Sequence, residues 1–98
     1  MKDPQAHAPI RQLRDEISDL DRAILNAINA RLERVSELKR YKDEHGLPFV
    51  DPDRERQLLD SLVASNRGPL SEEGLRQLFS ELLDLMKREV SRDGTSGG

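Results

Sequence analysis

Apolar residues recur every three or four positions over the first half of the chain, a spacing typical of an amphipathic helix with a coiled-coil-like seam. No Gly or Pro falls between Ile10 and His45, and Gly46 follows directly. We therefore predict one long helix from roughly Pro9 to Glu44. The column at this spacing, which is apolar at every position but Arg31, consists of Ile10, Leu13, Ile17, Leu20, Ile24, Ala27, Arg31, Val35 and Leu38.

Two further stripes of apolar residues predict two shorter helices. Asp51-Pro52 is an N-cap followed by proline at the first helical position, and the run 66–69 (Asn-Arg-Gly-Pro) ends this second helix. Ser71 caps a third helix, with Leu70 and Leu75 at the positions of a hydrophobic staple. The stripes are Leu58, Leu59, Leu62 and Val63, then Leu75, Leu78, Phe79, Leu82, Leu83 and Met86. No strand pattern is visible, so we predict an all-α fold of three helices.

The two ends of the chain differ in composition from the apolar stripes between them. We expect one helical domain over residues 9–90. Residues 1–8 are expected to form a disordered N-terminus, and residues 91–98, which are rich in Gly and Ser, a flexible tail or linker.

The length of the first helix predicts a dimer. At 1.5 Å per residue it would span about 50 Å, whereas a compact domain of this size has a radius of gyration near 13 Å. The helix would therefore extend past its own globule and expose an apolar seam. Hydrophobic residues make up 35% and aromatic residues 3% of the chain, so its own core is small. We expect a second copy to cover the seam in an intertwined homodimer.

Composition excludes several classes of partner. The net charge of −3 and the lack of a basic run give no electrostatic footprint for nucleic acid. No apolar stretch is long enough to cross a bilayer, and the N-terminus lacks the apolar core of a signal peptide, so a cytoplasmic location is expected. There is no Cys, and no metal-ligand spacing, Ser-His-Asp arrangement or phosphate loop. We expect neither a metal ion nor a cofactor.

Basic residues at unusual positions point to a binding site. Arg31 interrupts the apolar column, where a cation is costly unless an anion meets it. Lys42 follows eleven residues later, close to three turns, and so projects from the same side about 16 Å along the axis. After a short turn the chain returns Arg54 and Glu55. Several cations and one carboxylate on an apolar face predict a site for a small molecule with more than one negative charge.

Each of these residues also has a purely structural interpretation. The stem of Arg31 could pack while its head reaches solvent, Lys42 suits the helix dipole, and Asp51 is first of all a cap. Arg14 lies 17 residues before Arg31, about 25 Å away and a quarter turn out of phase. If Arg14 functions in the site, it therefore acts from a partner chain across the dimer interface.

These residues resemble the all-helical (AroQ-type) chorismate mutases. The similarity runs from about Ile10 to Met86 and is carried by four stretches, whose spacing agrees without a gap. The turn before Asp51 and the run 66–69 are similar to the mutase domain fused to bacterial 3-deoxy-D-arabino-heptulosonate-7-phosphate (DAHP) synthases. The stretches are residues 13–21 (LRDEISDLD), 29–31 (NAR), 39–42 (KRYK) and 51–56 (DPDRER).

The resemblance implies a cofactor-free isomerase that rearranges chorismate to prephenate in phenylalanine and tyrosine biosynthesis. It implies two sites per dimer, in which the carboxylates of the substrate meet Arg14 of the partner chain, Arg31 and Arg54. Lys42 would contact a carboxylate and the ether oxygen. Glu55, with Asp51, would bind the ring hydroxyl.

The third helix departs from the family pattern. The family usually places Gln or Glu there to hydrogen-bond the ether oxygen, with a small polar residue one turn earlier. The ungapped match puts Val90 and Met86 at these positions, and neither donates a useful hydrogen bond. Glu89 would serve only if it rotated into the site and were protonated. We predict a slow mutase in which Lys42 acts alone on the ether oxygen.

Two other functions fit the same residues. One is a lyase that removes pyruvate from isochorismate on the same scaffold. The other is a weakly active or non-catalytic regulatory dimer that binds chorismate or prephenate for a DAHP synthase, either as a fused domain or as a partner. The missing donor on the third helix favours the regulatory alternative, whereas residues 51–56 favour the mutase.

Overall fold

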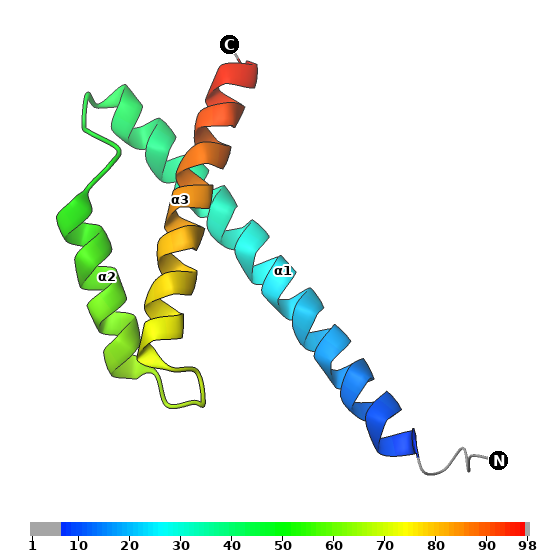
Figure 1. Cartoon of the computed structure of the whole chain (residues 1–98). Helices are drawn as coiled ribbons and strands as arrows, with labels where there is room; N and C mark the ends of the chain where they lie inside the picture. The colour runs from blue at the N-terminus through cyan, green and yellow to red at the C-terminus, as the bar shows by residue number, and fades with distance from the viewer. Residues whose placement is uncertain (1–6, 98) are drawn as a thin grey trace. The chain divides into compact units, whose positions relative to one another are not determined.

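The computed structural model describes residues 7–97, with side chains up to residue 92, and consists of three helices in this range (Figure 1). They are α1 (Ala8–Glu44), α2 (Pro52–Ser65) and α3 (Glu72–Gly97). The predicted all-α class with one long and two shorter helices is confirmed. The chain divides into two compact units, one ending at Glu33 and one beginning at Arg34.

Hydrogen bonds of the Schellman type end α1. Leu47 N donates to Lys42 O at 2.8 Å and Gly46 N donates to Asp43 O at 3.3 Å, the pair of bonds that defines this motif. Gly46 has a φ of +66°, which glycine adopts without a steric penalty from a Cβ. The predicted stop after Glu44 is therefore explained by local backbone chemistry.

The N-terminus of α2 is capped as the sequence predicts. Asp51 Oδ1 accepts a hydrogen bond from Arg54 N at 3.1 Å, and Pro52 occupies the first helical position. At the other end, Asn66 Nδ2 donates to Leu70 O at 2.7 Å and Gly68 N donates to Asn66 Oδ1 at 3.1 Å. These two bonds shape the short loop into α3.

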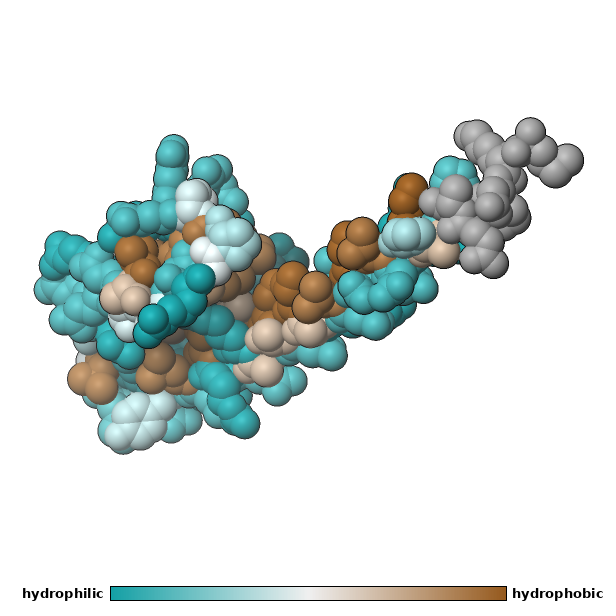
Figure 2. Space-filling view, turned by 90° about the horizontal axis from the view of Figure 1, so that it is seen from below, coloured by the Kyte–Doolittle hydropathy of each residue, from teal (hydrophilic) through white to brown (hydrophobic). Residues whose placement is uncertain are grey.

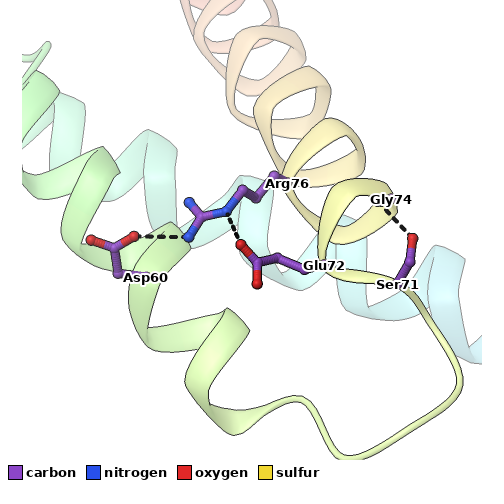
Figure 3. Close-up of polar contacts among 5 residues, drawn as sticks. All are labelled: Asp60, Ser71, Glu72, Gly74 and Arg76. Atoms are coloured by element: carbon purple, nitrogen blue, oxygen red, sulfur yellow. Dashed lines mark hydrogen bonds and ion pairs between the residues drawn. The ribbon is translucent and has the colours of Figure 1, made fainter.

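Polar contacts also fix the N-terminal end of α3 (Figure 3). Ser71 Oγ accepts from Gly74 N at 3.0 Å, as expected of an N-cap. Arg76 of α3 lies between Glu72, at 3.2 Å, and Asp60 of α2, at 3.1 Å. The hydrogen bond to Asp60, followed by that to Glu72, raises the pKa of Arg76. This ion pair joins α2 to α3 near their connecting loop.

The apolar core of the second unit lies along α3, which packs side by side with α2. Its buried apolar residues are Leu75, Leu83, Met86 and Val90. Leu78 belongs to the stripe predicted for this helix, yet its side chain is 53% exposed. The core therefore occupies a narrower stripe of α3 than the apolar pattern suggested, and it continues one turn further, to Val90.

The first half of the apolar column of α1 is exposed within one chain. None of the residues of α1 is buried, and the large apolar residues of its first half are 46–61% exposed. Figure 2 shows this brown apolar surface recurring along the helix that leads away from the grey N-terminal residues. The exposed residues are Ile10, Leu13, Ile17, Leu20, Ile24 and Leu25.

The ends of the chain differ in part from the expected boundaries. Helix α3 continues to Gly97, so residues 91–97 are helical where a flexible tail was expected. Val90 is buried, which favours a helix up to this residue. The Gly and Ser residues that follow have a low helix propensity and give no local reason for the last turn of α3. At the other end, residues 1–6 of the expected disordered segment lie outside the described residues. The domain limits of 9 and 90 stay predictions.

The described helices do not have the dimensions and composition of a membrane span. None of α1, α2 and α3, within residues 7–97, is both long and apolar enough to cross a membrane.

Candidate active site

Lys42 lies in the last turn of α1 and is tied to the loop that leads into α2. Its half-buried side chain donates from Nζ to the carbonyl oxygen of Phe49 at 3.4 Å. One turn earlier, Lys39 Nζ lies 5.8 Å from the centre of the Phe49 ring, within the range of a cation–π contact. The two lysines thus hold the loop, and the loop in turn limits where the ammonium of Lys42 can lie.

The N-terminal turn of α2 carries three of the predicted site residues. Asp51 uses one carboxylate oxygen as the helix cap, so its structural interpretation holds in this structure. Arg54 is exposed, and its guanidinium forms no ion pair with a described residue. A cation in this turn opposes the helix dipole and is not offset by a partner. Nothing in the fold of the described residues therefore requires Arg54.

Glu55 is engaged by a residue that the sequence did not place in the site. Lys87 of α3 lies with its Nζ 2.9 Å from Glu55 Oε1 and 3.5 Å from Asp84 Oδ1. The side chains of Lys87 and Glu55 are 28% and 31% exposed, so this pair is less solvated than the i,i+3 pair of Arg56 with Asp53. The hydrogen bond to Glu55 raises the pKa of Lys87 and outweighs the opposite effect of burial.

The third-helix positions separate into two environments. Met86 and Val90 are both 2% exposed and belong to the apolar core of the second unit. Glu89 is half-buried, and its carboxylate accepts a charge-assisted contact from Arg92 at 3.2 Å. A carboxylate in such an ion pair accepts hydrogen bonds but does not donate them. None of the three offers a donor in this structure.

The remaining predicted residues, Arg14 and Arg31, lie in the first unit on α1. Arg31 is half-buried and Arg14 is exposed, and neither guanidinium pairs with a carboxylate of the described residues. The lack of a partner is not in itself diagnostic. It is shared by other exposed arginines of the described chain, namely Arg11, Arg40, Arg67 and Arg88.

A metal site would need several acidic or histidine side chains close together. No cluster of three or more such side chains is present in the part of the chain that the structure describes. The structure thus brings Lys42 to its loop and pairs Glu55 with Lys87. The substrate contacts of all the predicted site residues stay predictions.

Several known proteins have sequences similar to that of this chain. The T-protein of Haemophilus influenzae is 38% identical over an alignment of 77 residues that covers 74% of this chain but 20% of that protein. The T-protein of Enterobacter agglomerans is 41% identical over 54 residues, 55% of this chain and 14% of that one. The chain thus spans a fifth or less of the length of these relatives. The 4-amino-4-deoxychorismate mutase of Streptomyces venezuelae is 30% identical and is 78% covered, over 81% of this chain.

Solved structures agree with these relatives. The structure of chorismate mutase (form II) from Thermus thermophilus superposes with a TM-score of 0.82 and 37% identity, covering 86% of this chain and 96% of that one. Form I of the same protein gives a TM-score of 0.78 and 38% identity, covering 80% and 98%. The sequence profile of the family described as Chorismate mutase type II matches residues 13–90. With most of its length inside that match, the chain belongs to the chorismate mutase type II family.

Proposed function

We propose that this chain catalyses the rearrangement of chorismate to prephenate. The observation that carries the proposal is the family match over residues 13–90, which contains every cation and carboxylate assigned above to the site. These are Arg14, Arg31, Lys42, Asp51, Arg54 and Glu55.

The residues supply what this reaction needs. The rearrangement is intramolecular, so it requires no nucleophile, proton shuttle or cofactor. Its first demand is to hold a flexible dicarboxylate in a compact reactive form, which is an orientation effect. Its second is to stabilise negative charge on the breaking ether oxygen, for which preorganised cations serve. Arginines and a lysine with a restrained ammonium group meet both demands.

We assign the roles by position within the family pattern. Arg31 and Arg54 would bind the substrate carboxylates, and Arg14 would do so from the partner chain. Lys42 would bind a carboxylate and the ether oxygen. Glu55 would accept a hydrogen bond from the ring hydroxyl. Asp51 would bind the ring hydroxyl together with Glu55, which lies in the same turn, where Glu55 N donates to Asp51 O at 3.1 Å.

The active form in this proposal is a homodimer. The exposed apolar column of α1 supports it, because the six large apolar side chains between Ile10 and Leu25 are each at least 46% exposed in a single chain. A contiguous apolar surface of that kind is typical of an interface. A second copy is the occupant that fits, because only a second copy would also deliver Arg14 to the site.

The relatives suggest two extensions of this function. Several of them are longer, and two are described as bifunctional chorismate mutase/prephenate dehydratase proteins. We therefore propose that the chain works beside a further domain or partner, of which a DAHP synthase is the one that its turn sequences favour. The match to a 4-amino-4-deoxychorismate mutase makes the amino analogue of chorismate a second candidate substrate.

A turnover assay separates these activities. Purified chain would be supplied in turn with chorismate, 4-amino-4-deoxychorismate and isochorismate, and prephenate, the amino product, salicylate and pyruvate would be followed. We expect prephenate from chorismate as the fastest reaction. Release of pyruvate from isochorismate would instead identify the lyase, and tight chorismate binding without turnover would identify a regulatory module.

Replacing Val90 by Gln tests the role of the third helix. Val90 occupies the position of the missing donor, so we expect Val90→Gln to raise kcat by about tenfold or more, since an added donor to the ether oxygen strengthens in the transition state. The control is Met86→Gln, one turn earlier and equally buried at 2% exposure. Both substitutions bury an amide and should cost about 1–3 kcal/mol of stability.

The measurements are steady-state kinetics and the free energy of unfolding of both variants. A rise in kcat confined to Val90→Gln would place this position beside the ether oxygen. Loss of stability in both variants with no gain in kcat in either would assign Val90 to the core alone.

A further inference from the structure

The ion pair between Glu55 and Lys87 joins α2 to α3 and differs from most other ion pairs of the described residues. Most of those pairs link residues three or four apart on one helix, where solvent-exposed charges contribute little. Lys87 instead reaches a residue of another helix at 2.9 Å, and about 70% of each side chain is removed from solvent. Such a pair is screened less by water and salt, so it fixes the position of both charges more firmly.

The geometry leaves part of Glu55 free for a ligand. Lys87 Nζ pairs with the Oε1 atom of Glu55 at 2.9 Å. An ionised carboxylate has two oxygens and about four acceptor positions, so Oε2 can still accept a hydrogen bond from a hydroxyl group. Asp84, at 3.5 Å, holds Lys87 from its own helix. The three residues therefore form a chain in which Lys87 holds Glu55 and Asp84 holds Lys87.

We propose that Lys87 is a positioning and specificity-determining residue that holds Glu55 to accept a ring hydroxyl and disfavours a ring ammonium group. This inference rests on the proposed function, which places Glu55 against the hydroxyl of chorismate. The family pattern gave no role to Lys87, and the pairing was not visible in the sequence.

The selectivity follows from charge. A hydroxyl needs only an acceptor oxygen, which Glu55 offers whether or not its charge is balanced. A primary amine is largely protonated at neutral pH and gains most from a carboxylate whose charge is unbalanced. With Lys87 at 2.9 Å, the charge of Glu55 is already met by one ammonium, and a second would be repelled by it. The pair therefore favours chorismate over 4-amino-4-deoxychorismate.

The test compares kcat/KM for these two substrates in the wild type and in Lys87→Met. We expect the preference for chorismate to fall by about tenfold or more, because a change of one to two kcal/mol between substrates corresponds to a factor of about 5–30. KM for chorismate should rise several-fold with little change in kcat, since Lys87 does not touch the reacting atoms. Lys87→Arg retains the charge and should keep the preference within about threefold of the wild type.

The matched control is Arg88→Met. Arg88 is the next residue on α3, is exposed and pairs with no carboxylate of the described chain. The Arg88→Met substitution removes one positive charge from the same helix without changing a contact to Glu55, so the substrate preference should not change. A double substitution adds a second readout: in a Glu55→Gln background, Lys87→Met should have no further effect on the preference.

The outcomes separate this inference from the proposed function. A wild type that turns over neither substrate overturns both. An active wild type whose preference is the same in Lys87→Met overturns the role of Lys87 alone, as does an equal change in Arg88→Met. Circular dichroism and thermal unfolding identify a variant that fails to fold. In that case Lys87→Gln takes its place under the same criteria.

Discussion

Arg54→Ala is expected to reduce kcat/KM for chorismate by about 10²- to 10³-fold while the helical fold persists, an effect of the size found when one charge-stabilising donor is removed from a site. At Arg54, a loss of activity is expected without a loss of stability. Arg54 is exposed, forms no ion pair with a described residue and sits in the first turn of α2, where a cation opposes the helix dipole. Its removal should leave the free energy of unfolding unchanged or slightly raised.

The matched control is Arg56→Ala. Arg56 lies on the same turn of α2 and is likewise exposed, but it pairs with Asp53. Exposed pairs of this kind contribute little, so this variant should keep nearly wild-type kinetics and stability. Steady-state kinetics with chorismate and thermal unfolding of both variants provide the comparison. Equal, small losses of kcat/KM in the two variants would show that Arg54 is a surface residue without a role in the site.

Local chemistry explains why the helices were predictable from the sequence. Asp51-Pro52, Gly46 and Ser71 act within a few residues of themselves, and each forms the cap or stop that its type favours. The apolar period of 3.6 residues marked which face of each helix is apolar. It did not show how much of that face one chain can bury, because burial depends on packing between elements. Leu78 is an example: it fits the period of α3 and remains exposed.

The candidate site was predictable only in part, for a similar reason. Lys42 and Arg31 stood out because they interrupt an apolar pattern, and Asp51 to Glu55 because they form a short motif. Lys87 carried no such signal. Its pairing with Glu55 depends on the register of α2 against α3, which the distance along the sequence does not define. Ion pairs between helices are therefore the part of this site that required a structure.

Met86 and Val90 are positions that the sequence placed in the site and the structure places in the core. The alignment placed Met86 and Val90 where polar residues are usual, and the structure finds both enclosed among apolar side chains. An apolar residue at such a position can have replaced a donor in the site, or can have joined the core when the donor became unnecessary. Lys87, one residue after Met86, supplies a polar group to Glu55 from the same helix. The candidate site thus contains a charged contact between α2 and α3, whereas Met86 and Val90 are buried apolar residues.

Mixing two inactive variants should restore part of the mutase activity. In the proposed dimer each site takes Arg31 and Arg54 from one chain and Arg14 from the other. Arg14→Ala and Arg31→Ala are each expected to be nearly inactive as homodimers. A hybrid of the two has one site with both changes and one site with neither. Random pairing after joint unfolding and refolding makes half of the dimers hybrids, so about a quarter of wild-type activity should return.

The control for this experiment is a mixture of Arg31→Ala with Arg54→Ala. These two residues come from the same chain in each proposed site, so every site of the hybrid keeps one defect and activity should stay low. Sedimentation of the wild type at micromolar concentration gives an independent reading. A folded monomer would leave the exposed column from Ile10 to Leu25 without its proposed cover. It would also remove Arg14 from the site, because 17 helical residues, about 25 Å, separate Arg14 from Arg31 along α1.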